Sequence, residues 1–200
     1  MNGNDRTPQI EFWFDFASTY SYLSAMRIET QAANRGVRVQ WRPFLLGPVF
    51  AAQGWNTSPF NIYPAKGAYM WRDMARLCAR YHLPLTKPDP FPQHSLLAAR
   101  VALAIPDDRQ LPGFCKAVFA AEFAEGLDIS DVQVLQTCLC AAGAPPDLLE
   151  TAQTPGIKSA LRAQVEEAMQ RGIFGAPSFV LGDELYWGDD RLDDALDRLA

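Results

Sequence analysis

Ser18 and Ser21 lie in the turn and first helical residues that follow the first predicted strand, where side chains can reach a ligand. A hydroxyl at a helix start can donate to a bound anion, and the free N–H groups there favour negative charge. A serine nucleophile would need a base, but no G-x-S-x-G motif is present and no motif places His82 or His94 beside Ser18. A serine hydrolase is therefore the weakest interpretation. The plain structural alternative is that Ser18 only caps its helix.

Thiol and metal chemistry find little support in the sequence. The four cysteines, Cys78, Cys115, Cys138 and Cys140, form no C-x-x-C pair, so we expect reduced thiols, most of them buried as small apolar side chains. The two histidines are far apart and lack the spacing of a metal motif. We predict no metal site.

The composition excludes several classes of partner. The chain has 200 residues, a net charge of −5 and 48% hydrophobic residues. An acidic chain of this kind is a poor ligand for nucleic acid, and its apolar stretches are too short to span a membrane. The first nine residues are polar, with no apolar segment of the signal-peptide type. We expect a cytoplasmic protein that binds neither nucleic acid nor membrane.

The elements that must position these residues begin with a strand. Apolar residues alternate along residues 10–16, helical spacing follows to residue 34, and alternation returns over 37–42 until Pro43, which marks a strand end or an edge. This is the length of a right-handed βαβ unit with parallel strands. Residues 45–65 contain many Gly and Pro residues and predict a long loop. The aromatic residues in and beside it, Phe44, Phe50, Trp55 and Phe60, are assigned to the core in preference to the pocket.

From residue 66 to about 172 the periodicity is helical, and prolines divide it into five or six helices. A hairpin around Gly182-Asp183 and a final helix after Gly188 follow. This order predicts an α/β protein with a thioredoxin-like fold and a large all-helical insertion. The discontinuous thioredoxin-like domain comprises 9–65 and 156–200, and the helical insertion domain comprises 66–155.

Thioredoxin-like oxidoreductases carry C-x-x-C where this chain has Ser18 and Ser21, so disulfide exchange through its own thiols is excluded. A proline before the third strand, usually cis and facing the active loop, is a second mark of the fold. Pro177, within Gly175-Ala176-Pro177-Ser178, is in the place for it.

The run Asp15-Phe16-Ala17-Ser18 followed by Ser21-Tyr22-Leu23 resembles the D-F-x-S-P-x-S-Y-L signature of 2-hydroxychromene-2-carboxylate isomerases. These enzymes are related to kappa-class glutathione transferases and DsbA-type oxidoreductases. Three further segments agree with the family, within residues 42–47, 64–70 and 174–192. Four segments in the same order are specific for the superfamily and less so for the reaction.

The resemblance implies that glutathione is the cofactor and that the Ser18 hydroxyl binds its sulfur. A free thiol with a pKa of about 8.5 is only about 3% ionised at pH 7. Lowering that pKa to about 6.5 makes it roughly three-quarters thiolate and requires about 2.7 kcal/mol of preferential stabilisation. The resemblance also assigns the backbone of Ala176, before Pro177, to the cysteinyl residue of glutathione, as an added strand would pair.

The charged ends of glutathione are assigned in the same way. Asn56 and Lys66 resemble the residues that hold its peptide portion, and Asp189 and Asp190 match the turn that receives its γ-glutamyl end. Ordinary roles stay open, since Lys66 suits a solvated helix start and the two aspartates suit helix caps. Thr19 stands where the family has proline, the interval from Asn56 to Lys66 is one residue longer than usual, and His94 stands where relatives have asparagine. We assign His94 to the substrate pocket and not to catalysis.

The implied activity is isomerisation of 2-hydroxychromene-2-carboxylate or a similar small aromatic intermediate of aromatic-compound degradation. The thiolate adds to a conjugated carbon, the ring opens, a former double bond rotates and elimination returns the thiol. One alternative is a kappa-class-like glutathione transferase, which stops after addition. Another is a non-catalytic thioredoxin-like binding module that binds no glutathione. A homodimer is a state that such relatives commonly adopt.

Overall fold

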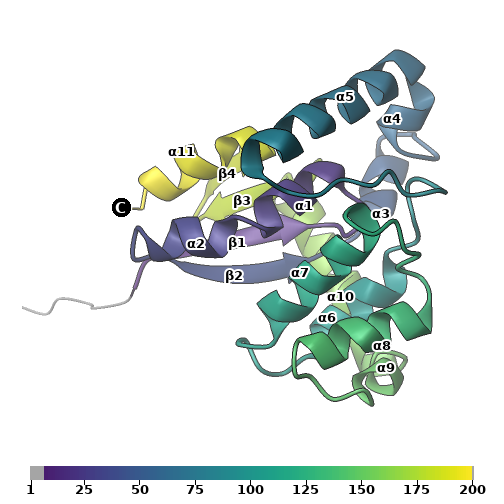
Figure 1. The fold of residues 1–200 in the computed structure, drawn as a ribbon. Helices are drawn as coiled ribbons and strands as arrows, with labels where there is room; N and C mark the ends of the chain where they lie inside the picture. Colours follow the sequence, from purple (N-terminus) through teal and green to yellow (C-terminus); the bar gives the residue numbers. More distant parts are fainter. Residues whose placement is uncertain (1–6, 200) are drawn as a thin grey trace, which may run out of the picture.

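A four-stranded sheet lies at the centre of the computed structural model, which describes residues 7–199 (Figure 1). The strands are β1 (Gln9–Phe14), β2 (Arg38–Pro43), β3 (Ser178–Leu181) and β4 (Glu184–Trp187), in the spatial order β2-β1-β3-β4. β1 pairs parallel with β2 and antiparallel with β3, and β3 pairs antiparallel with β4. The predicted βαβ unit and hairpin therefore form one sheet, and the thioredoxin-like fold is confirmed. Pro43 ends β2, which is an edge strand.

The central strand β1 is apolar on both faces because both are covered. Phe12 and Phe14 face one layer, where the Phe12 ring stacks on Phe179 of β3 with centroids 5.6 Å apart. Trp13 faces the other layer and packs against Phe44. Figure 1 shows α1, α2 and α11 over the first face, and helix α10 (Pro155–Gln170) packs on the second through Leu161 and Val165, among others.

The segment after β1 is not one helix, as the sequence predicts, but two: α1 (Thr19–Ala25) and α2 (Ile28–Ala33). Arg27 lies at the break. Its side-chain Nε donates to the backbone oxygen of Leu23 at 3.1 Å, and its Nη2 donates to Asp189 at 2.6 Å. The arginine thus binds one carbonyl in the last turn of α1 while it pairs with Asp189, which is distant in the sequence.

The predicted loop at residues 45–65 is also partly wrong, since it holds α3 (Leu46–Ala52) and α4 (Pro59–Ile62). Its prolines lie in first turns, where the missing N–H has no intrahelical partner to lose. Pro59 is the first residue of α4, and the Ser58 hydroxyl caps that helix by accepting from Phe60 N at 3.3 Å. Proline here marks helix starts.

Six helices follow between residues 64 and 170, as predicted. They are α5 (Pro64–Tyr81), α6 (Leu96–Ala104), α7 (Leu111–Phe123), α8 (Val132–Ala141), α9 (Leu148–Thr151) and α10. The final predicted helix appears as a 3-10 turn, η1 (Asp189–Arg191), and α11 (Leu192–Asp197). The predicted boundary between 65 and 66 falls in the first turn of α5.

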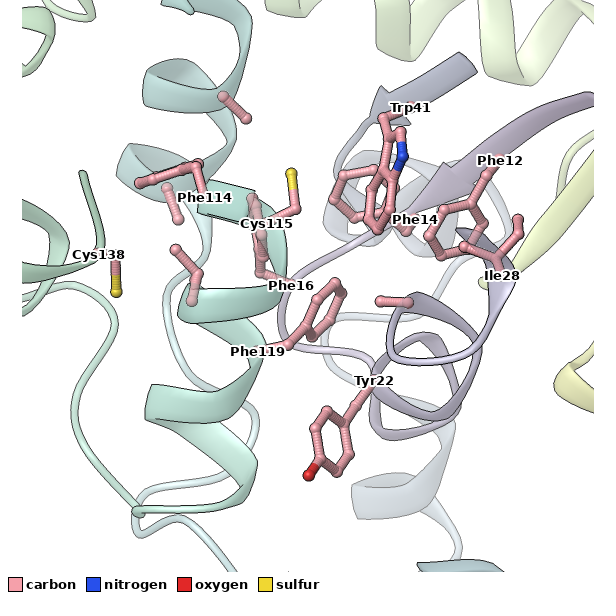
Figure 2. Packing of buried hydrophobic residues seen from close by; sticks show 14 of the residues in the cluster. Phe12, Phe14, Phe16, Tyr22, Ile28, Trp41, Phe114, Cys115, Phe119 and Cys138 are labelled. Atoms are coloured by element: carbon pink, nitrogen blue, oxygen red, sulfur yellow. The ribbon is translucent and has the colours of Figure 1, made fainter. Parts of the chain in front are cut away.

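Helix α7 joins the inserted helices to the sheet. Its Phe119 ring lies 5.7 Å from Phe14 and 5.1 Å from Phe16, and Phe114 lies 6.3 Å from Phe16. Figure 2 shows these rings between α7 and the end of β1. The two predicted domains therefore share one continuous hydrophobic cluster. This packing fixes the turn after β1, which carries Ser18.

All four cysteines have free thiols, and Cys78, Cys115 and Cys138 are buried as expected, whereas Cys140 is exposed. Burial raises the pKa of Cys78 and of Cys138 to about 11. Within residues 7–199, no helix combines the length and the apolar character required to cross a bilayer.

Candidate active site

A cavity of about 1410 Å³ opens beside the turn after β1. It is bounded by the start of α1, by α3 to α5, by the segment before α6 and by the chain on both sides of the β3–β4 hairpin. All seven site residues predicted from the sequence line it: Ser18, Asn56, Lys66, Ala176, Pro177, Asp189 and Asp190. Segments from opposite ends of the chain thus meet at one site.

Ser18 is the N-cap of α1, with φ −92° and ψ 115°. Its Oγ accepts a hydrogen bond from Ser21 N at 3.3 Å and donates one to the backbone oxygen of Ala176 at 3.0 Å. The capping role considered as the plain alternative is real, and it coexists with a place on the cavity wall. Ser21, in contrast, is fully buried, and its hydroxyl has no partner in the described part of the chain.

The segment before β3 lies beside Ser18 on the cavity wall. The Ala176–Pro177 peptide bond is cis. Within residues 7–199, no protein group accepts a hydrogen bond from the Ala176 N–H. The Pro177 oxygen accepts from Gly188 N at 3.0 Å, which fastens the turn that leads to Asp189. Ala176 thus offers a backbone donor beside the Ser18 hydroxyl.

The two neighbouring carboxylates Asp189 and Asp190 line the cavity in different environments. Asp189 is buried, and its Oδ1 accepts from Ser24 Oγ at 2.8 Å and from Arg27 Nη2 at 2.6 Å. Burial raises the pKa of Asp189, and the Arg27 charge opposes this rise. Asp190 is exposed and lies 3.3 Å from Arg191 Nη2. Among residues 7–199, no group of three or more His, Cys, Asp or Glu side chains is suited to a metal ion.

Polar and basic groups come from the α3–α5 region. Lys66 lies in the first turn of α5, exposed, with its Nζ 4.8 Å from the ring centroid of Tyr63. Asn56 is exposed in the segment before α4. The cavity lining thus includes a lysine from α5 and two aspartates from the turn after β4.

Thr19, which stands in the place of the family's proline, is buried, and its Oγ1 donates to Met70 Sδ of α5 at 3.3 Å. This contact attaches the start of α1 to α5. His94 is exposed on the cavity wall, where the sequence analysis assigns it.

The aromatic residues near the predicted loop are divided between core and cavity. Phe44 is fully buried, as predicted. Phe50, Trp55 and Phe60 line the cavity; Phe60 also packs against the core cluster, whereas the assignment of Phe50 and Trp55 to the core is wrong. All three side chains are half-buried.

Asp15 is the cavity residue whose role the sequence reasoning missed. It follows β1, is 5% exposed and lines the cavity. Its carboxylate accepts from Ser95 Oγ at 2.6 Å, Leu46 N at 2.7 Å and Ala17 N at 3.1 Å. Burial raises the pKa of Asp15, and the three hydrogen bonds oppose that rise. Its only signal in the sequence is its place in the D-F-x-S run.

The family model of the DSBA-like thioredoxin domain matches residues 9–200. A 2-hydroxychromene-2-carboxylate isomerase from Sphingobium xenophagum is 33% identical over 94% of this chain and 95% of its own. Glutathione S-transferase kappa 1 from Homo sapiens is 25% identical over 92% of this chain and 87% of its own. A solved structure of 2-hydroxychromene-2-carboxylate isomerase matches with a TM-score of 0.85 at 27% identity, covering 96% of this chain and 95% of that one.

Proposed function

Because the chain belongs to the 2-hydroxychromene-2-carboxylate isomerase family, within the DSBA-like thioredoxin domains, we propose that it is a glutathione-dependent isomerase. Its proposed substrate is 2-hydroxychromene-2-carboxylate or a similar small aromatic intermediate of aromatic-compound degradation. The observation that carries this proposal is the convergence of Ser18, Ala176, Lys66 and the two aspartates on one cavity.

The chemistry of the cavity walls fits glutathione. Glutathione is an extended tripeptide with carboxylates, one ammonium group and a central thiol. The Ala176 N–H suits its central backbone, because an extended peptide pairs with a free backbone donor as an added strand does. Asp189 and Asp190 suit the ammonium at one end, and Lys66 and Asn56 suit a carboxylate and an amide at the other.

Ser18 supplies the hydrogen bond that the reaction needs. Glutathione, when bound, supplies a thiolate that adds reversibly to a conjugated carbon of the substrate. The Ser18 hydroxyl has a single proton, which it donates to Ala176 O in the absence of a ligand. To donate to a sulfur it must turn away from that oxygen, while Ser21 N continues to donate to its Oγ. This switch stabilises the charged form of the thiol more than the neutral form.

The remaining wall suits a flat aromatic substrate. The Phe50 and Trp55 rings lie 5.8 Å apart on the cavity wall, and Phe60 and Phe91 also line it. Aromatic side chains bind a planar ring by stacking and exclude water around the reacting carbon.

The test is isomerisation of 2-hydroxychromene-2-carboxylate followed by its ultraviolet spectrum, with and without glutathione. We expect saturable turnover that requires glutathione and leaves its concentration unchanged. Absence of turnover together with absence of glutathione binding in calorimetry would reject the enzyme and favour the non-catalytic binding module.

The second candidate is a kappa-class-like glutathione transferase, which the similarity to the kappa-class transferase over 92% of this chain supports. In that case a conjugate accumulates and glutathione is consumed, as mass spectrometry would show. A cytoplasmic location and a homodimeric state remain predictions.

A further inference from the structure

Asp15 receives four hydrogen bonds at the point where β1 ends. Its Oδ1 accepts from Ser95 Oγ and Ala17 N, and its Oδ2 accepts from Leu46 N. Its backbone oxygen also accepts from Ser18 N at 3.0 Å. None of the ion pairs between residues 7 and 199 includes Asp15. A buried carboxylate without a cation is costly, so hydrogen bonds alone hold this group.

Two of the four bonds shape the turn that presents Ser18. The Ser18 N–H to Asp15 O bond closes a four-residue turn, and the Ala17 N–H to Asp15 Oδ1 bond braces it from the side. Aspartate favours the first position of such a turn for this reason. Ser18 leaves the turn in an extended conformation, and its hydroxyl therefore points at Ala176 O.

The other two bonds attach the same carboxylate to two distant walls of the cavity. Leu46 N is the first amide of α3, which carries Phe50 to the cavity. Ser95 directly precedes α6 and follows His94 on the cavity wall. The side chain has two acceptor oxygens for three donors, a capacity that asparagine, with one acceptor oxygen, lacks.

We infer that Asp15 is a positioning residue, which sets the orientation of the Ser18 hydroxyl and fixes the α3 and α6 walls relative to it. The inference deepens the proposed function, on which it rests for the identity of the ligand. The orientation of the Ser18 side chain depends on the protein alone and can be probed without glutathione.

The test uses a thiol introduced by Ser18→Cys in a Cys140→Ser background, which removes the exposed native thiol. The pKa of the introduced thiol is read from the pH dependence of its alkylation by iodoacetamide. Adding Asp15→Asn separates two effects of opposite sign. Loss of the nearby negative charge of Asp15 would by itself lower the pKa of the introduced thiol. If the turn changes shape and the sulfur no longer faces Ser21 N, the thiolate loses a hydrogen-bond donor and the pKa rises.

We expect Asp15→Asn to raise the thiol pKa by about one unit, which is roughly a tenfold slower alkylation at neutral pH. An unchanged or lowered pKa overturns the inference. The matched control is Asp131→Asn, the same chemical change at the N-cap of α8, where the carboxylate accepts from Gln133 N at 2.8 Å. It should leave the thiol pKa unchanged.

A second variant covers the case in which Asp15→Asn does not fold. Ser95→Ala removes one donor and leaves both backbone donors in place, and we expect a smaller rise in the thiol pKa. No rise overturns the inference. In the native background, folded Asp15→Asn should also shift the pH profile of isomerisation upward. Because alkylation needs no glutathione, failure of the proposed function and failure of this inference give different results.

Discussion

The Ser18 hydroxyl lies 3.0 Å from the Ala176 backbone oxygen, although 158 positions separate the two residues in the chain. The bond joins the turn after β1 to the cis-proline segment before β3. The bond uses the single hydroxyl proton of Ser18, so this proton is not free to form a hydrogen bond to a bound thiolate. Ligand binding at this site must therefore exchange one hydrogen bond for another, which keeps the Ser18 side chain oriented in both states.

Ser18→Ala removes this donor. We expect a folded protein in which the pKa of bound glutathione is about one unit higher, so that isomerisation at neutral pH slows roughly tenfold or more. Thiolate absorbance of the complex across pH gives the pKa, and steady-state kinetics give the rate. Ser130→Ala changes an exposed serine outside the cavity and serves as the control. Unchanged turnover in Ser18→Ala would reject the assigned role.

Arg27→Met leaves the buried Asp189 carboxylate without its cation. Since removing one partner of a buried pair strands the other charge, we expect the free energy of unfolding to fall by about 3 kcal/mol. The comparison is Arg35→Met, which breaks pairs with the exposed Asp193 and Asp197 and should cost less than about 1 kcal/mol. Urea denaturation of both variants measures the difference, and equal losses would contradict the prediction.

Glu122→Gln should make stability less dependent on pH. Glu122 is fully buried, neither carboxylate oxygen has a partner in the described residues, and burial raises its pKa well above the usual value, with a further rise from the Asp15 charge. The wild-type fold keeps its full stability below the unfolded-state pKa of Glu and loses it as pH rises toward the folded-state pKa.

The free energy of unfolding of Glu122→Gln minus that of the wild type should therefore increase with pH, by up to about 1.4 kcal/mol per pH unit above pH 5. Urea denaturation at pH 5, 6 and 7 measures this difference. The effect of the amide on stability that does not depend on pH is the same at each pH, so it drops out when the three differences are compared. Glu125→Gln, at an exposed neighbour, should show no such growth. A difference that stays constant across pH would refute this account of Glu122.

Gly175→Ala should disturb the cavity rim. A Cβ at Gly175 would meet Trp187 Nε1 at 2.4 Å and Cε2 at 3.0 Å, so the indole must move away from its contact with Phe174. We expect a several-fold higher KM for the aromatic substrate. Gly156→Ala has open space around the new Cβ and should leave KM unchanged. A crystal structure of Gly175→Ala with the indole in its original place would disprove the steric argument.

Native alkylation should modify Cys140 alone. Cys140 is exposed, whereas the other thiols are buried, and burial raises the pKa of Cys78 and of Cys138 to about 11 and that of Cys115 well above its ordinary value. Mass spectrometry after iodoacetamide treatment should show one modification, and none in Cys140→Ser. Unfolding in denaturant should expose the remaining thiols.

The sheet and the six inserted helices follow from local patterns in the sequence. Alternating apolar residues define β1 and β2, and prolines in the helical region lie between helices or in their first turns. The break after α1 does not follow from such patterns, because the Arg27 side chain reaches Asp189 only in the folded chain. The helices α3 and α4 were missed because Pro48 and Pro59, read as loop residues, lie in their first turns.

All seven predicted site residues line one cavity, and six of them belong to segments that match the family in order along the chain, whereas Asn56 lies outside those segments. The role of Asp15 depends on contacts with Leu46 and Ser95, which lie 31 and 80 positions away. No periodicity or spacing encodes such contacts. The aromatic lining of the cavity could not be predicted for the same reason, because the packing of α3 decides whether Phe50 faces the core or the cavity.

The order β2-β1-β3-β4 has a consequence for synthesis of the protein. β1 pairs with β2 within the first 43 residues, but its other edge meets β3, which begins at Ser178. During translation, the Phe-rich strand therefore leaves the ribosome long before the segment that covers it. The nascent chain must therefore keep one edge of a hydrophobic strand from associating with other chains until β3 has been synthesised.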